Sequence, residues 1–176
     1  MTARHCSPSV RARLFGMAVV LAGLAAGQAF AQSTDLPNRK EPLPGITTAG
    51  QPSAEQLAAA AKTGVKTVID LRALTEDRGM DERATVEKLG MSYVTLPVDG
   101  GEGVTYANAT ALDKLLADAK GPVLLHCASG NRVGALLALR DKLKGADNDA
   151  ALALGVKSGL GGLKPTVEKK LAQGHD

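Results

Sequence analysis

Residues 122–134 read PVLLHCASGNRVG, and this stretch carries the strongest indication of the fold. Its first half, PVLLHC, is a continuous apolar run of the kind found in buried strands. The segment that follows the short loop, RVGALLALRDKLKG at residues 132–145, predicts a helix with one apolar side. A buried strand that passes through a small loop straight into a helix is the repeating unit of α/β domains.

The rest of the chain shows the same alternation of apolar strand patterns and helix patterns. Strands are predicted at residues 46–49, 65–72 and 91–98, and helices at residues 53–64, 81–89, 105–119, 147–158 and 164–173. Parallel strands need crossover connections, and these helices supply them. We therefore expect a single α/β domain with a mainly parallel central sheet flanked by helices, in an order that one sequence does not reveal.

Residues 1–31 have the pattern of a secretory signal peptide. Three arginines precede an apolar run at residues 14–30, which ends in an A-x-A site, AFA, before Gln32. An uncleaved membrane anchor is the alternative, because the run is about long enough to span a bilayer. We expect cleavage after residue 31, a periplasmic or secreted mature chain, and no stable membrane insertion.

The segment after the leader reads QSTDLPNRKEPLPG and contains three prolines with little apolar periodicity. It predicts a flexible N-terminal arm over residues 32–45. Residues 46–176 then form one domain, since neither an internal repeat nor a second boundary is present in the sequence.

The charge balance argues against nucleic acid as a partner. The net charge of +3 comes entirely from the three leader arginines, so residues 32–176 carry no basic field. The aromatic residues outside the leader are Tyr93 and Tyr106, which are too few for a surface on which bases stack. The oligomeric state does not follow from the sequence.

Cys127 is the single cysteine that remains once the leader is removed. Cysteines of exported proteins usually pair, because their compartment is oxidising. The plain interpretation is a buried small hydrophobic residue, which free cysteines often are. The alternative is a reactive thiol.

The loop after Cys127 favours the reactive thiol. It consists of four small or turn-tolerant residues, Ala128, Ser129, Gly130 and Asn131. Such a loop can direct its backbone N–H groups at an anion, and the start of the next helix adds further donors. Arg132 contributes a bidentate, always-charged fork. A helix N-terminus and a nearby arginine also favour the thiolate, so we interpret Cys127 as a nucleophile beside an anion-binding loop.

Other polar residues receive supporting interpretations. His126 faces the side of the sheet opposite Cys127 and is expected to steady the loop. Asp70, in the strand VIDLR, is expected to pair with Arg72 or to cap its loop. Glu76 and Asp77 lie in a polar loop that could border the site, and we interpret them as a solvated face. No His, Cys, Asp or Glu grouping has the spacing of metal ligands, so neither a metal nor a cofactor is expected.

The segment HCASGNR resembles the loop of cysteine-dependent phosphatases, in which His-Cys, five residues, Arg and a Ser or Thr follow one another. Here four residues separate Cys127 from Arg132, and Val133 replaces the hydroxyl residue. The shorter spacing is also that of rhodanese-type sulfurtransferases, with their Cys-x-x-Gly-x-Arg loop. Together with AGQPSAEQL, TGVKTVIDLR and LGMSYVTLPVD, the loop is similar to the phosphatase-like domain of beta-lactamase-hydrolase-like proteins, which have the tyrosine and dual-specificity phosphatase fold.

This resemblance implies a mechanism. Cys127 would attack phosphorus to give a thiophosphate intermediate, while the N–H groups of residues 128–132 and the Arg132 guanidinium hold the phosphate oxygens. The family uses an aspartic acid on a preceding loop as general acid, and Asp99 is the candidate here; its alternative is a turn-forming role before Gly-Gly. The substrate would be a small phosphate ester or a phosphoprotein.

Three functions therefore remain open. The first is an exported cysteine-dependent phosphatase of the tyrosine or dual-specificity type. The second is a sulfurtransferase that carries a persulfide on Cys127, which needs no general acid. The third is a non-catalytic binder of an oxyanion or a phosphopeptide.

Overall fold

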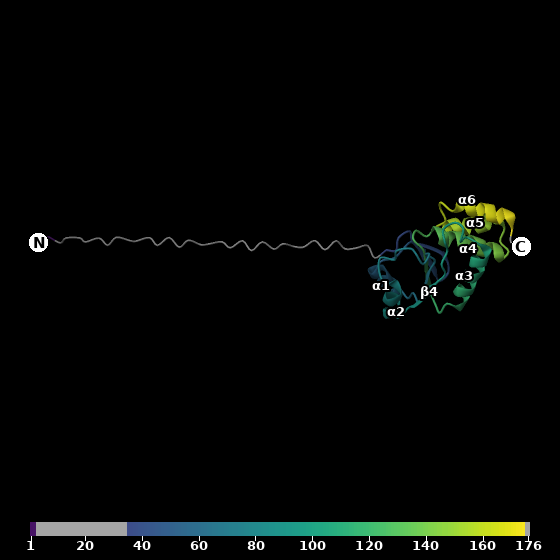
Figure 1. The fold of residues 1–176 in the computed structure, drawn as a ribbon. Coiled ribbons are helices and arrows are strands. Elements are labelled where there is room, and N and C mark those ends of the chain that lie inside the picture. Colours follow the sequence, from purple (N-terminus) through teal and green to yellow (C-terminus); the bar gives the residue numbers. More distant parts are fainter. Residues whose placement is uncertain (3–34, 175–176) are drawn as a thin grey trace. The chain divides into compact units, whose positions relative to one another are not determined.

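The computed structural model describes residues 1–2 and 35–174 (Figure 1). The signal peptide expected over residues 1–31 lies outside the described residues, apart from its first two. Within residues 35–174 the chain forms strands β1 (Lys40–Leu43), β2 (Ile46–Ala49), β3 (Thr67–Asp70), β4 (Ser92–Thr95) and β5 (Val123–His126). The helices are α1 (Ala54–Lys62), α2 (Glu82–Lys88), α3 (Tyr106–Asp118), α4 (Asn131–Leu143), α5 (Asn148–Lys157) and α6 (Lys164–Gln173).

The strands form one sheet in the order β1-β2-β5-β3-β4. Strands β2, β5, β3 and β4 are parallel to their neighbours, and β1 alone runs antiparallel, beside β2. The predicted α/β fold with a mainly parallel sheet is therefore confirmed. Strand β5 lies in the centre, so the loops that follow β2 and β3 flank the loop that follows β5.

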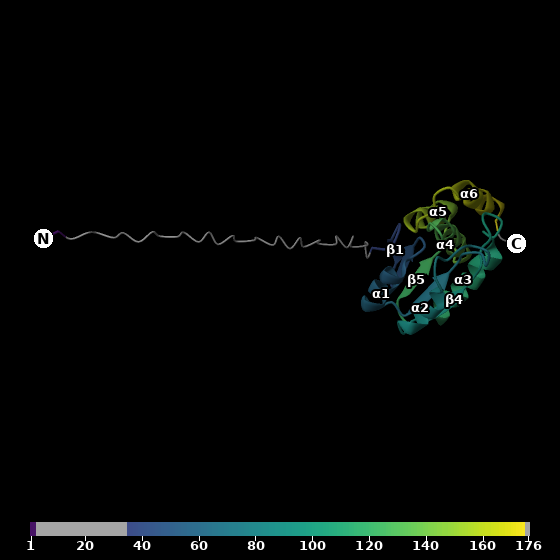
Figure 2. The same ribbon diagram turned by 60° about the vertical axis from the view of Figure 1, so that its left-hand side comes forward.

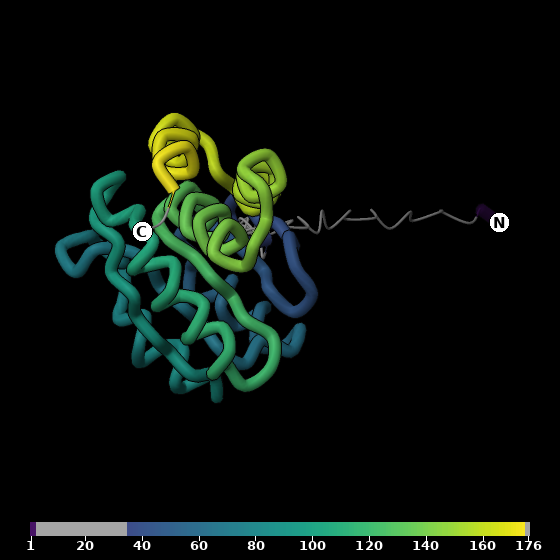
Figure 3. Tube along the Cα trace, turned by 90° about the vertical axis from the view of Figure 1, so that its right-hand side faces the viewer, coloured from purple at the N-terminus to yellow at the C-terminus, as the bar shows by residue number. Residues whose placement is uncertain are grey.

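Helices cover both faces of the sheet (Figure 2). On one face, α1 and α2 pack on the sheet through a cluster that includes Leu57, Val86 and Leu124. On the other face, a larger cluster joins the sheet to α3 and α4 and extends to α5 and α6. Figure 3 shows α5 and α6 against the outer side of α4. Helix α4 is consequently buried along most of its length, which fixes where its first residues lie.

The predicted helix boundaries rest on recognisable caps. The side chain of Ser53 accepts a hydrogen bond from the backbone N–H of Gln56, whose own side chain returns to the Ser53 backbone, so α1 starts with a complete capping box. The side chains of Asp81, Thr105 and Asp147 cap three further helices by accepting a backbone N–H, without the reciprocal hydrogen bond. Among the described residues, no helix is both long and apolar enough to cross a bilayer.

The prediction of a flexible N-terminal arm is wrong for much of that segment. Lys40–Leu43 form β1, which pairs with β2 across a tight turn at Pro44 and Gly45. Prolines are tolerated there because β1 is an edge strand, where a missing N–H need not break the ladder. Leu36 packs against the core beside α1, and the carbonyl of Pro37 accepts a hydrogen bond from the Gly50 N–H at 2.7 Å. The local sequence pattern does not indicate this structure, because the apolar contacts of the segment are with residues distant in sequence.

Candidate active site

Cys127 lies at the carboxyl end of the central strand, the edge at which parallel α/β sheets bind ligands. Its side chain is buried, and its backbone N–H faces the Ala49 carbonyl at the end of β2, at 3.4 Å. After three intervening residues the chain enters α4 at Asn131. The strand, the loop and the helix start therefore have the arrangement that the sequence predicted.

Gly130 gives the loop its curvature. Its φ of 88° lies in the left-handed region, which residues with a side chain rarely adopt, and it occupies the N-cap of α4 without a side-chain cap. In this conformation the Gly130 N–H donates to the Cys127 sulfur at 3.1 Å. The backbone of the loop therefore contacts the cysteine sulfur directly.

Neighbouring segments brace the loop from outside. The Gln51 N–H donates to the Ala128 carbonyl at 3.1 Å, and Asn38 Nδ2 donates to the Ser129 carbonyl at 3.2 Å. A Cβ on Gly50 would lie 3.0 Å from the Ala128 carbonyl oxygen, so the two backbones meet closely. These contacts fix the positions of two carbonyls of the loop.

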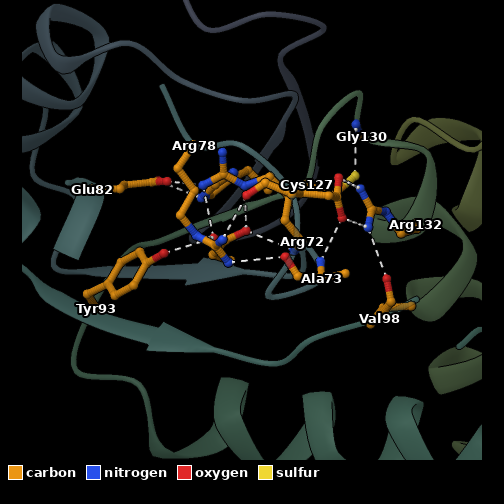
Figure 4. A network of polar contacts seen from close by, with 12 residues as sticks. Arg72, Ala73, Arg78, Glu82, Tyr93, Val98, Cys127, Gly130 and Arg132 are labelled. Atoms are coloured by element: carbon orange, nitrogen blue, oxygen red, sulfur yellow. Dashed lines mark hydrogen bonds and ion pairs between the residues drawn. The ribbon is translucent and has the colours of Figure 1, made fainter. Parts of the chain in front are cut away.

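Arg132, in the first turn of α4, is held by two partners from other loops (Figure 4). Its Nη1 and Nη2 donate to the two carboxylate oxygens of Glu76, at 2.5 and 2.7 Å. Its Nη1 also donates to the Val98 carbonyl at 2.9 Å. The guanidinium has five N–H donors, and these contacts use three. The Nε–H and the second Nη2–H lie on the other edge of the fork. The guanidinium also makes a hydrogen-bond contact with the Cys127 side chain.

In the Glu76–Arg132 pair, each side chain stabilises the charged form of the other. Hydrogen bonding from Arg132 lowers the pKa of Glu76, and the hydrogen bond to Glu76 together with the nearby Cys127 raises the pKa of Arg132. Glu76 is further fixed because its carboxylate accepts the Ala73 N–H at 2.6 Å. The interpretation of Glu76 as part of a solvated face is therefore wrong, whereas Asp77 is exposed as expected.

A hollow of about 370 Å³ opens beside the loop. It is lined by parts of four segments: residues 73–76, 99–100 and 129–132, and Leu163. Asp99 lines it with an exposed side chain, directly after the residue whose carbonyl holds Arg132. The structure thus brings Asp99 and Arg132 to one hollow, as an acid that serves a leaving group at this loop requires.

Asn131 connects the loop to a distant segment. Its Oδ1 accepts the Gly161 N–H at 2.8 Å and the Leu163 N–H at 3.3 Å. It was predicted only as a member of the anion-binding loop. Its side chain in fact ties the connection between α5 and α6 to the start of α4, and so places Leu163 in the wall of the hollow.

The residues predicted as supporting form a buried ion-pair network behind the loop (Figure 4). Asp70 accepts hydrogen bonds from Arg72 at 2.9 Å through both carboxylate oxygens, and from Tyr93 at 2.8 Å. Arg72 also pairs with Glu82, and His126 Nε2 lies 2.9 Å from Glu82. His126 thus contacts a carboxylate on the face of the sheet away from Cys127, in agreement with its predicted orientation.

Asp70, Glu82 and His126 bring their potential ligand atoms within 4.8 Å of one another, which the spacing in the sequence did not reveal. They come from the end of β3, the start of α2 and the end of β5. Arg72 donates to both carboxylates, however, and supplies the cation that they need. The donor set is already compensated, and we propose no metal there.

Glu76 is the main residue of the site that sequence reasoning ranked too low. Its loop follows β3, and β3 is the direct neighbour of β5 in the sheet. The loops after adjacent parallel strands meet at the same edge, so the strand order would have identified Glu76, and that order is not readable from one sequence.

Comparison with known proteins identifies the relatives of this arrangement. Residues 42–144 match the family model described as "Beta-lactamase hydrolase-like protein, phosphatase-like domain". The chain is 33% identical over 120 residues to a beta-lactamase hydrolase-like protein of Xylella fastidiosa. The aligned region covers 65% of this chain and 28% of the relative. The chain thus corresponds to little more than a quarter of that relative's length.

Solved structures show the same fold. TpbA of P. aeruginosa, in a cysteine-to-serine variant in complex with pTyr, is 26% identical with a TM-score of 0.56, over 74% of this chain and 79% of that one. The core catalytic domain of the S. cerevisiae PP-IP phosphatase Siw14 is 17% identical with a TM-score of 0.63, over 82% and 90%. At that identity the second likeness concerns the fold alone.

Proposed function

We infer the function from one premise: the chain belongs to the family of phosphatase-like domains of beta-lactamase hydrolase-like proteins. We propose that it hydrolyses a phosphate monoester, with Cys127 as the nucleophile. The observation that carries this proposal is that the Cys127 sulfur contacts both the Gly130 N–H and the Arg132 guanidinium, and that Arg132 lines the hollow. The phosphotyrosine complex of TpbA supports an enzyme of the tyrosine or dual-specificity type.

The first step makes the intermediate. The Cys127 thiolate attacks phosphorus, the S–P bond forms, and the bond from phosphorus to the leaving oxygen breaks. In this proposal the Nε edge of the Arg132 guanidinium and the backbone N–H groups of the loop hold the three phosphate oxygens, on which negative charge rests throughout. Asp99 donates its proton to the departing oxygen.

The second step releases phosphate. Asp99, now a carboxylate, takes a proton from a water molecule whose oxygen attacks phosphorus. The S–P bond breaks, inorganic phosphate forms, and the electron pair returns to Cys127 as thiolate, which the Gly130 N–H stabilises. Val133 has no hydroxyl to assist this departure, so we expect the second step to limit turnover.

Sulfur transfer is the second candidate, favoured by the four-residue spacing between Cys127 and Arg132. In that reaction the thiolate attacks the outer sulfur of thiosulfate, sulfite leaves, and a persulfide forms on Cys127. Cyanide then takes this sulfur as thiocyanate and regenerates the thiolate. No oxygen leaving group is protonated, so Asp99 has no role.

Turnover with two substrates separates these candidates. Purified protein is given an aryl phosphate in one reaction and thiosulfate with cyanide in the other, with Cys127→Ser as the control in both. Phosphate release that disappears in the variant is the expected result. Thiocyanate formation without phosphate release would overturn the phosphatase proposal, and binding without either product would favour a non-catalytic oxyanion or phosphopeptide binder.

We also propose that the domain acts in the periplasm or outside the cell, since residues 1–31 have the sequence pattern of a cleaved leader. Cell fractionation followed by mass spectrometry of the N-terminus tests this. A mature chain that begins at Gln32 is expected, and a cytoplasmic chain that retains Met1 would contradict it.

A further inference from the structure

The charges at the hollow beside Cys127 are unbalanced. Among its lining residues in the described chain, Arg132 is the one cation, and Glu76 and Asp99 are acidic. The ion pair with Glu76 already offsets the arginine charge. A substrate therefore finds a cation where its phosphate binds and none around its leaving group.

Two loops at the mouth of the hollow extend this imbalance. Residues 73–77 read ALTED and residues 99–103 read DGGEG, so the two loops hold four carboxylates and no lysine or arginine. Asp77 and Glu102 are exposed, as is Asp99. We call Asp77 and Glu102 the outer acids, because they lie in the loops that line the hollow but are not themselves lining residues.

The basic residue nearest to these loops in sequence does not offset their negative charge. Arg78 follows Asp77, but its guanidinium is turned toward the interior. It donates to the Asp70 carboxylate at 3.2 Å and to the Glu76 carbonyl at 3.1 Å. This cation belongs to the buried network and is not presented to a ligand in the hollow.

The rest of the wall is uncharged and consists of Ala73, Thr75, Gly100, Ser129, Asn131 and Leu163. Leu163 lines the hollow and is held there by the hydrogen bond from its N–H to Asn131 Oδ1. Lys164, next to it, places its ammonium 3.7 Å from Glu168 on the same helix. A leaving group would therefore rest against an aliphatic side chain between acidic loops.

These observations lead us to a substrate class, which rests on the phosphatase activity proposed above. We propose that the site selects a monoester with a single phosphate whose surrounding groups are uncharged or cationic. Esters with further phosphate or carboxylate groups near the reacting phosphate are disfavoured. The loops act by repulsion, because like charges at the mouth of the hollow oppose binding and opposite charges steer it.

Three peptides test this selection. Each carries one phosphotyrosine, flanked by lysine, alanine or glutamate residues, so that the leaving group is constant and only the neighbouring charge differs. We expect kcat/KM to fall in the order lysine, alanine, glutamate, with about fivefold or more between the extremes. High ionic strength is expected to reduce the ratio of kcat/KM between the lysine and glutamate peptides, since the charges involved are exposed.

A pair of double variants assigns the preference to the loops. Asp77→Asn with Glu102→Gln removes the outer acids and is expected to shrink the ratio between the lysine and glutamate peptides. Glu87→Gln with Asp118→Asn removes the same charge near the ends of α2 and α3, which lead into the amino ends of β4 and β5, opposite the site. This control is expected to leave the ratio unchanged.

Binding of the same peptides to Cys127→Ser, followed by fluorescence anisotropy, keeps the selection separate from the chemistry. Equal kcat/KM values, or faster turnover of the glutamate peptide, would overturn the charge selection while the phosphatase stands. If no peptide is hydrolysed but the lysine peptide still binds most tightly, the phosphatase proposal would be overturned and the charge selection supported. No turnover and no binding of any peptide would overturn both.

Discussion

The carboxylate of Glu76 holds Arg132 through both terminal nitrogens, at 2.5 and 2.7 Å, across 56 positions of sequence. This contact uses one edge of the guanidinium fork and does not involve the edge that contains Nε. Glu76 thereby fixes the direction in which the phosphate-binding donors point. It is a positioning residue and does not touch the reacting atoms.

Replacing Glu76 with glutamine is expected to lower kcat/KM for a phosphate ester about 10- to 100-fold, because a bidentate ion pair becomes a single hydrogen bond from Arg132 to a neutral amide oxygen. The inhibition constant for vanadate, which binds the same donors, should rise in parallel. Glu87→Gln removes an exposed acid from α2 and serves as the control. A Glu76→Gln variant that is faster than wild type would mean that Glu76 competes with the substrate for Arg132.

Asp99→Asn is expected to slow phosphate release by about a hundredfold to ten-thousandfold when the leaving group is a poor one, as in a phosphotyrosine peptide. With p-nitrophenyl phosphate the loss should be smaller, since that leaving group departs without a proton. Sulfur transfer should be unaffected. Equal losses with both phosphate esters would show that Asp99 acts by forming its turn and not as an acid.

The local features of the fold were predictable because each depends on neighbours in sequence. Ser53 and Gln56 indicate a capping box within four residues, and the run VLLH is apolar enough to predict a buried strand. Cys127 and Arg132 were identified by the same kind of short-range spacing. The helices and the parallel strands of the sheet agree with these expectations.

The errors concern contacts between segments far apart in the chain. The strand at Lys40–Leu43 is stabilised by pairing with β2, and its own composition reads as a loop. Glu76 looks solvated in sequence, and its role appears only when β3 is placed beside β5. The tether from Asn131 to Leu163 spans 32 positions and depends on how α5 and α6 return to α4. None of these contacts leaves a local signature.

Gly130→Ala tests the conformation of the loop. A Cβ at this position has room, since its nearest neighbour would be 3.6 Å away, but the φ of 88° is strained for alanine by about 1–2 kcal/mol. We expect a lower free energy of unfolding and loss of activity, because relaxation moves the N–H away from the Cys127 sulfur. Gly145→Ala has a similar φ of 96° in open space after α4, and should lose stability while it keeps activity.

The buried network behind the loop should make stability depend on pH in the acid range. Burial raises the pKa of Asp70, but hydrogen bonds from Arg72 and the charge of His126 outweigh this and lower it to about 2, from an ordinary value of 3.8. A lowered folded-state pKa stabilises the fold above the unfolded-state pKa, and this stabilisation is lost as the pH falls from about 4 to about 2. It amounts to about 2 kcal/mol.

Urea unfolding of the wild type and of Asp70→Asn at a series of pH values measures this contribution. At neutral pH we expect the variant to be about 3–5 kcal/mol less stable, because Arg72 loses one of its two buried carboxylate partners. That difference should shrink by about 2 kcal/mol as the pH approaches 2, since Asp70 then becomes protonated in the wild type. A difference that stays constant over this range would mean that folding leaves the pKa of Asp70 unchanged, and that the ion pair with Arg72 does not stabilise this carboxylate.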